Sequence, residues 1–95
     1  AKTLAAELGP HGITVNNVLP GYTKTARLEQ ILADRSKATG KTEGEIARTM
    51  LATVPLGRFA EATEIANVIA FLATPAAAYV NGINVPVDGG RTLSL

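Results

Sequence analysis

Apolar residues at the start of the chain recur at helical spacing. One face of the predicted helix carries Ala1, Leu4, Ala5 and Leu8. Gly9-Pro10 follows as a stop signal, because glycine favours a helix end and proline cannot continue the helix. No capping residue precedes the helix. We therefore expect the start of this helix, and further sequence, to lie upstream of Ala1.

Two short stretches predict β-strands. The first, from Ile13 to Leu19, is rich in β-branched residues, which is typical of a buried strand, and Pro20-Gly21 ends it. The second alternates apolar residues at Ile83, Val85 and Val87. Asp88-Gly89-Gly90 ends that strand, and Pro86 lacks a ladder donor. The second strand is therefore expected at a sheet edge.

The segment between these strands predicts three helices. The first carries apolar residues at Leu28, Ile31 and Leu32 and is broken near Gly40. Thr42 and Glu45 have capping-box spacing at the start of the second, which we expect Pro55 to close. One face of the third carries Ile65, Val68, Ile69 and Leu72. We expect that face to pack inward on a sheet.

Helices that connect two strands are typical of an α/β fold with a parallel sheet. With 95 residues, the chain has room for a single core. Two strands alone would leave open edges and uncovered helix faces, so we expect upstream strands to complete the sheet. Residues 1–95 are accordingly interpreted as the C-terminal fragment of one domain.

Composition argues against several classes of function. The net charge of +1 with scattered Lys and Arg provides no basic stripe for nucleic acid. With no Cys and a single His, His11, no zinc site is expected, and a reducing, cytoplasmic location fits. The apolar run from Ile65 to Ala73 is too short to span a membrane, and no targeting leader is expected.

Several short motifs occur in order along nearly the whole chain. They are Leu4-Ala5-Ala6-Glu7-Leu8, Gly12-Ile13-Thr14-Val15-Asn16-Asn17-Val18, Pro20-Gly21 with Thr25, Pro55-Leu56-Gly57-Arg58-Phe59, Glu64-Ile65-Ala66, Phe71-Leu72-Ala73, Ala78-Tyr79-Val80-Asn81-Gly82 and Val87-Asp88-Gly89-Gly90. In this order and spacing the chain resembles the C-terminal portion of the short-chain dehydrogenase/reductase family, and is similar to its 3-oxoacyl-[acyl-carrier-protein] reductase-like members.

The resemblance implies a doubly wound, Rossmann-type parallel sheet, of which this chain supplies the last two strands, their helices and a substrate lid at residues 26–54. The family's glycine-rich loop, active-site Ser and Tyr-x-x-x-Lys pair would lie upstream, so no catalytic residue is expected here. Tyr79 is not the catalytic Tyr, because Ile83 stands where Lys would follow. Gly89-Gly90-Arg91 opens no helix and is interpreted as a turn.

The resemblance also implies a cofactor site for NAD or NADP at the end of the first strand. Its expected residues in this chain are Pro20, Gly21, Thr23 and Thr25. The family contacts the nicotinamide carboxamide through backbone groups after Pro-Gly, and a Thr at the position of Thr25 binds the carboxamide or pyrophosphate. Most members carry an aliphatic residue at the position of Thr23. Without the family context, a strand-ending type II turn would explain Pro20-Gly21.

Other polar residues have structural interpretations. Asn16 and Asn17 lie in the predicted strand and are expected to make structural hydrogen bonds. We expect Arg58 to form a structural ion pair near Glu61 and Glu64. His11 is expected to be an exposed turn residue, and Tyr79 is expected to pack.

The implied substrate is a small carbonyl or alcohol compound. From Lys24 to Arg48, a stretch that includes most of the lid, the chain carries six basic and four acidic residues, which favours an anionic carrier such as a phosphopantetheine thioester. A solvated helix face explains this excess equally well.

The expected partners are further copies of the chain, in a homodimer or homotetramer. The predicted contacts are the third helix, through Ala62, Ala66, Ala70 and Ala73, the last strand, and the tail from Arg91 to Leu95. These alanines are equally explained as good helix formers. The alternative function is a non-catalytic oligomerisation or interaction module.

Overall fold

The computed structural model describes residues 2–92. Its helices are α1 (Lys2–Leu8), α2 (Ala26–Thr39), α3 (Glu43–Leu51) and α4 (Ala62–Leu72), with short 3-10 helices η1 (Gly9–His11) and η2 (Pro75–Ala77). Its strands are β1 (Asn17–Pro20) and β2 (Asn84–Val87). The predicted order of helices and strands is confirmed, although both strands are shorter than the sequence pattern indicated.

β1 and β2 form a parallel pair, as predicted. Asn17 lies opposite Asn84, and Leu19 lies opposite Pro86, whose nitrogen carries no hydrogen to donate. Among residues 2–92, β1 is the single neighbour of β2. Because both strands run in the same direction, Pro20 and Val87 end side by side at one edge of the sheet.

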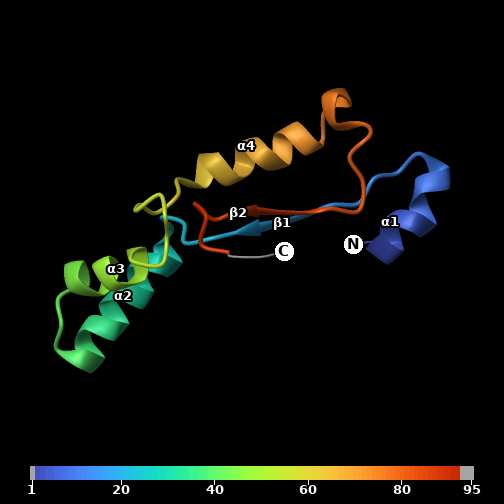
Figure 1. Ribbon diagram of the computed structural model, residues 1–95. Helices are drawn as coiled ribbons and strands as arrows, with labels where there is room; N and C mark the ends of the chain where they lie inside the picture. The colour runs from blue at the N-terminus through green and yellow to red at the C-terminus, as the bar shows by residue number, and fades with distance from the viewer. Residues whose placement is uncertain (1, 93–95) are drawn as a thin grey trace.

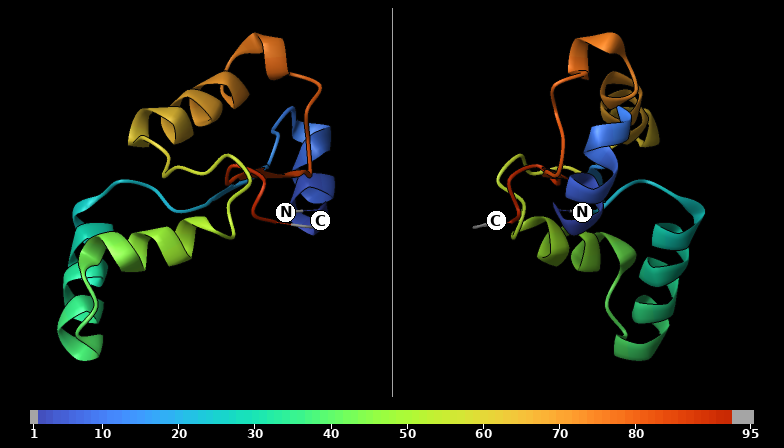
Figure 2. Two further views of the ribbon diagram at one scale, coloured as in Figure 1. Left: turned by 60° about the vertical axis from the view of Figure 1, so that its left-hand side comes forward. Right: turned by 90° about the vertical axis from the view of Figure 1, so that its right-hand side faces the viewer.

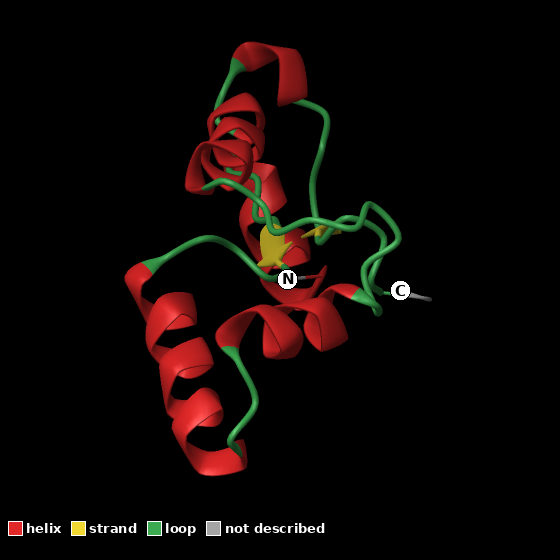
Figure 3. Cartoon of the chain, turned by 90° about the vertical axis from the view of Figure 1, so that its left-hand side faces the viewer, coloured by secondary structure: helices red, strands yellow, loops and turns green. Residues whose placement is uncertain are grey.

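The helices are distributed around this strand pair (Figure 1). α4 lies along one side of the strands, and the α2–α3 pair lies beyond their carboxyl ends, while α1 lies near their amino ends (Figures 1 and 2). Figure 3 shows the strands between α4 and the α2–α3 pair. Within the described range, no helix has the length and apolar character that a membrane crossing requires.

Local sequence signals explain where the helices begin and end. Thr42 and Glu45 form the predicted capping box of α3: the Thr42 hydroxyl accepts from the Glu45 amide at 3.1 Å, and the Glu45 carboxylate accepts from the Thr42 amide. α2 ends at Gly40, whose φ of 74° is the left-handed conformation that glycine adopts without strain. α3 ends at Leu51, so the helix stops before the expected terminator Pro55.

The apolar core of the described chain lies in the α2–α3 pair. Leu28, Ile46 and Met50 are buried together, and Tyr22, Leu32 and Phe59 pack against them. The chain is elongated, 55 × 24 × 21 Å, and its radius of gyration of 16.9 Å exceeds the roughly 12 Å of a compact domain of this length. The sheet is therefore not enclosed by the described residues.

Three expectations of burial are therefore not met within residues 2–92. The described residues do not bury β1, because Asn17, Leu19 and Pro20 are exposed and only Val18 is half-buried. On α4, Ile69 is 53% exposed instead of packed inward, whereas the other three residues of that face are half-buried. Tyr79 does not pack, since its side chain is fully exposed. In each case the described chain supplies no neighbouring element over the side chain.

Candidate functional site

The loop after β1 is held at the carboxyl edge of the sheet by backbone hydrogen bonds. The Gly21 amide donates to the Val87 carbonyl at 2.9 Å, which continues the strand pairing by one residue. Farther along, Thr23 pairs with Ala60 in an isolated parallel bridge. This bridge uses the Ala60 amide, which donates to the Tyr22 carbonyl at 2.9 Å, and the Lys24 amide, which donates to the Ala60 carbonyl at 2.8 Å. Backbone hydrogen bonds thus hold the loop to β2 at Gly21 and to Ala60 at Tyr22 and Lys24.

An open depression lies along this loop. It is lined by Pro20, Gly21, Tyr22, Thr23, Thr25, Arg27, Leu28 and Ile31. The structure therefore brings the four residues predicted from sequence to one surface, beyond the carboxyl ends of the parallel strands. Open α/β sheets bind their ligands at this edge.

The two threonine hydroxyls in the depression are oriented by different partners. Thr23 Oγ1 donates to the Gly21 carbonyl at 3.0 Å, and its lone pairs are left as acceptors. Thr25 is the N-cap of α2, where its Oγ1 accepts from the Leu28 amide at 3.2 Å. A hydroxyl that accepts one bond still has a proton to donate. The capping role of Thr25 was missed from sequence, although a Thr before a helical apolar pattern is its usual signal.

These donors and acceptors fit the amide end of a nicotinamide ring. A carboxamide offers one carbonyl oxygen as acceptor and one NH2 group as donor. The Thr25 hydroxyl can donate to the first, and Thr23 Oγ1 can accept from the second. The apolar surfaces of Pro20, Leu28 and Ile31 line the same depression and suit a flat ring.

Asp88 follows β2 and organises the turn beside the loop. One of its carboxylate oxygens accepts from the Gly90 amide at 3.0 Å and the other from the Thr92 amide at 2.9 Å. These bonds, those of Thr92 foremost, hold the pKa of the Asp88 carboxyl below its usual value. The turn at residues 88–90 was predicted, but this role of the Asp88 side chain was not. An Asp followed by two glycines is the signal that indicates it.

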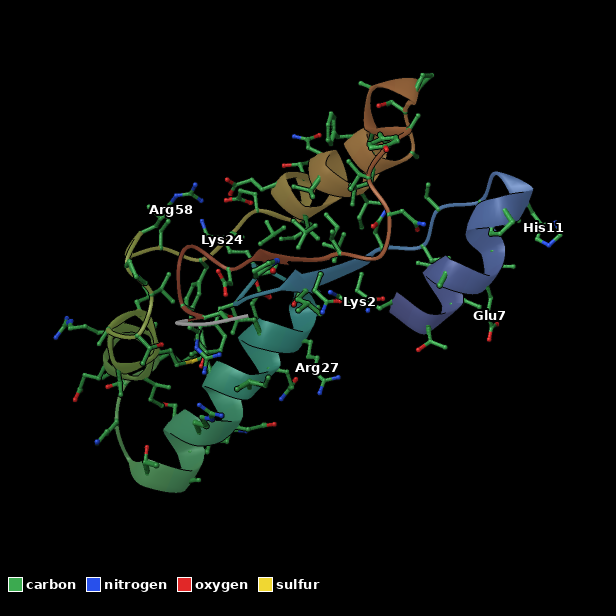
Figure 4. The ribbon with its side chains drawn as sticks, turned by 45° about the vertical axis from the view of Figure 1, so that its right-hand side comes forward. Lys2, Glu7, His11, Lys24, Arg27 and Arg58 are labelled. Atoms are coloured by element: carbon green, nitrogen blue, oxygen red, sulfur yellow. The ribbon has the colours of Figure 1, made fainter. Side chains whose placement is uncertain are left out.

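Arg58 forms the predicted structural ion pair. Its Nη1 and Nη2 atoms donate to Glu64 Oε1 and Oε2 at 2.6 and 2.9 Å, and the Glu61 amide also donates to Glu64 Oε1. The hydrogen bond from Arg58 is the main reason that the pKa of Glu64 is lowered to about 2 and that the pKa of Arg58 is raised. Lys24 pairs with Glu61 at 3.0 Å, so both cations lie at the start of α4 (Figure 4).

The structural interpretations of Asn16, Asn17 and His11 are confirmed. The Asn16 side chain donates to the Val80 carbonyl at 3.1 Å and accepts from the Ile83 amide, and Asn17 Nδ2 donates to Asn84 Oδ1 at 3.0 Å. His11 is exposed at the end of η1, away from the strands (Figure 4). Between residues 2 and 92 no three His, Asp or Glu side chains lie close enough to hold a metal ion.

Comparison with known proteins extends these observations. Residues 1–92 match the family model described as enoyl-(acyl carrier protein) reductase. The chain is 45% identical over 91 residues to cyclohexanol dehydrogenase of Rhodococcus sp. (strain TK6), covering 96% of this chain and 30% of that protein. It is 42% identical over 94 residues to a 3-oxoacyl-[acyl-carrier-protein] reductase of Haemophilus influenzae, covering 99% of this chain and 34% of that protein.

The fold also matches a solved structure. YwfH, an NADPH-dependent reductase involved in bacilysin biosynthesis, superposes with a TM-score of 0.88 at 33% identity, over 99% of this chain and 35% of that one. The chain thus spans about a third of the curated relatives that it matches. The chain belongs to the short-chain dehydrogenase/reductase family, and its two parallel strands and helices are part of a Rossmann-type α/β fold.

Proposed function

We propose that the whole protein transfers a hydride between NAD or NADP and a carbonyl or alcohol substrate, and that this chain holds the nicotinamide end of the cofactor. One observation carries this proposal: Pro20, Gly21, Thr23 and Thr25 line one depression at the carboxyl edge of a parallel sheet. The NADPH-dependent reductase YwfH, similar in fold, supports the choice of cofactor.

The roles proposed for these residues follow from their hydrogen bonds. A bound nicotinamide supplies or accepts the hydride. Thr25 donates to the carboxamide and Thr23 accepts from it, which together fix the rotation of the ring and hence the face presented to the substrate. Gly21 keeps the loop close to the sheet edge, where a side chain would stand in the way. Hydride transfer itself needs an acid that this chain is not expected to supply.

The α2–α3 pair, with residues 26–54 as the lid, is proposed to enclose the substrate. Three residues of α2, Arg27, Leu28 and Ile31, line the depression, which supports a role for the pair beside the bound substrate. The proposed substrate class includes 3-oxoacyl thioesters, because a 3-oxoacyl-[acyl-carrier-protein] reductase is among the relatives. A cyclohexanol dehydrogenase, 45% identical, is also among the relatives, which supports the broader class of secondary alcohols and ketones.

The partners proposed are further copies of the chain, as a homodimer or homotetramer. Ala66 and Ala70 are exposed on α4, and Ile69 and Phe71 are more than half exposed beside them. Such a surface of small and apolar residues favours close approach of another helix. The predicted tail contact extends to Leu95, and residues 93–95 lie outside the described residues. The absence of cysteine supports a cytoplasmic location.

Direct binding and turnover measurements test the proposed function. The whole protein should bind NADH or NADPH, measured by cofactor fluorescence, and should oxidise it in the presence of a ketone or 3-oxoacyl thioester. The 95-residue chain alone should show no turnover, because no Tyr in it is followed four residues later by Lys. If the whole protein binds neither cofactor, the proposed function is wrong. Turnover by the isolated chain would contradict the proposal that the catalytic acid lies outside this chain.

A further inference from the structure

Three segments that are distant in sequence meet at the Arg91 side chain. Its guanidinium carbon lies 4.7 Å from the centroid of the Tyr22 ring, within the range of a cation–π contact. Its Nε donates to Thr53 Oγ1 at 3.3 Å. Arg91 therefore links the turn after β2 to two other segments: the cofactor loop, defined as residues 21–25, and the lid exit, defined as residues 53–57.

The turn that carries Arg91 is itself seated against the lid exit. The Leu56 amide donates to the Gly89 carbonyl at 3.1 Å. A Cβ atom on Gly89 would lie 2.8 Å from Val54 Cγ1, and one on Gly90 would lie 3.1 Å from Pro55 Cγ. Both glycines have positive φ, 65° and 92°, so side chains are disfavoured here by backbone conformation as well as by space. The backbone turn that carries Arg91 is thus held against the lid exit.

Tyr22 connects Arg91 to the core of the α2–α3 pair. Its ring meets that of Phe59 edge to face, with centroids 6.2 Å apart, and both rings pack against the cluster of Leu28, Ile46 and Met50. Tyr22 also lines the depression that contains the predicted cofactor residues. Thr53, the other partner of Arg91, donates to the Met50 carbonyl at 2.8 Å near the end of α3.

We propose that Arg91 is a positioning residue that fastens the cofactor loop to the lid exit and thereby keeps the nicotinamide contacts of Thr23 and Thr25 in place. The proposal rests on the proposed function, since it assigns Arg91 an effect on cofactor binding. Arg91 does not line the depression, so it acts through Tyr22 and Thr53 and not by touching the ligand. An arginine suits this task because its planar guanidinium can cover a ring while its Nε donates sideways.

Hydrogen exchange tests, without any ligand, whether Arg91 fastens the cofactor loop to the lid exit. In the whole protein, Arg91→Met should speed amide exchange about threefold to tenfold in the cofactor loop and the lid exit, as expected for the loss of one cation–π contact and one hydrogen bond. Lys2→Met is the control, because it removes the same charge from an exposed position on α1, outside the lid, and leaves the contacts of Arg91 intact. Arg91→Lys keeps the positive charge and should retain part of the protection from amide exchange that Arg91→Met loses.

Variants of Tyr22 test whether its ring is the group through which Arg91 acts. Arg91→Met should change exchange far less in a Tyr22→Leu background, which lacks the ring, than in a Tyr22→Phe background, which keeps it. Exchange unaffected by Arg91→Met, or changed equally in both backgrounds, would overturn the fastening.

Cofactor titration tests the consequence for the site. Arg91→Met should raise the dissociation constant for NADH or NADPH about twofold to tenfold, and Lys2→Met should leave it unchanged. Faster exchange with unaltered cofactor affinity would disprove the positioning role. If the unmodified protein binds neither cofactor, the proposed function fails, and the exchange measurements alone decide whether Arg91 fastens the two segments.

Discussion

A Cβ atom placed on Gly21 would lie 2.7 Å from both Cα and Cβ of Asp88. The backbones that leave the two parallel strands therefore meet at van der Waals contact, with no room for a side chain between them. This close approach brings the cofactor loop and the Asp88 turn together at the edge of the sheet. The sequence resemblance pointed to Gly21 as a cofactor residue, and the structure adds this packing requirement.

Replacing Gly21 by Ala should therefore destabilise the whole protein, by about 1–3 kcal/mol, because backbone atoms would have to move. Gly44→Ala is the control: on α3 the nearest atom to an added Cβ is Thr42 Oγ1 at 3.9 Å, and Ala favours a helix by about 0.5–1 kcal/mol. Chemical denaturation measures both changes. A Gly21→Ala variant as stable as the unmodified protein would mean that the strand ends separate easily.

Local signals in the sequence were sufficient for the helices. The capping box of α3 and the glycine at the end of α2 depend on residues within a few positions of one another. The parallel pairing of β1 and β2 followed from the helices between them. These features needed no knowledge of distant neighbours.

Features that depend on tertiary neighbours were not predicted. The burial of β1 and of Ile69 depends on elements that pack over them, and a β-branched or apolar pattern does not say whether such elements are present. The contact of Arg91 with Tyr22 joins opposite parts of the sequence and has no local pattern. The four cofactor residues came from family resemblance, and their role stays a prediction.

Thr25 is expected to serve two roles that a pair of variants can separate. Thr25→Val removes the N-cap of α2 and should cost about 1 kcal/mol of stability. It also removes the proposed donor to the carboxamide, worth about 0.5–1.5 kcal/mol, or a roughly twofold to tenfold rise in the cofactor dissociation constant. Thr25→Ser keeps the hydroxyl and should preserve both. A Val variant that is less stable but binds cofactor normally would restrict Thr25 to capping.

The Arg58–Glu64 pair predicts a pH dependence of stability in the acid range. The pKa of Glu64 is about 2 in the folded chain, against a usual 4.5, so the folded state binds this proton less readily than the unfolded state. The stabilisation is present above about pH 4.5 and is lost as pH falls from there toward 2. Denaturation of Glu64→Gln at several pH values should show a deficit in the free energy of unfolding at pH 7, which shrinks as pH falls below about 4.5 and disappears only near pH 2. Arg58→Met should remove most of the same dependence, and a deficit independent of pH would contradict the assignment.

The exposed face of α4 predicts a self-association surface in the whole protein. Ala66 and Ala70 lie one helical turn apart and are both exposed, close to the half-exposed Ile69. Glu at either position would place a charge and a long side chain where a second helix has to approach, so Ala66→Glu and Ala70→Glu should shift the oligomer toward monomers in light scattering. Glu43→Lys, a charge change on exposed α3, is the control and should leave the mass unchanged. A protein that is monomeric before substitution, or an oligomer that both Glu variants leave intact, would show that these alanines serve only helix formation.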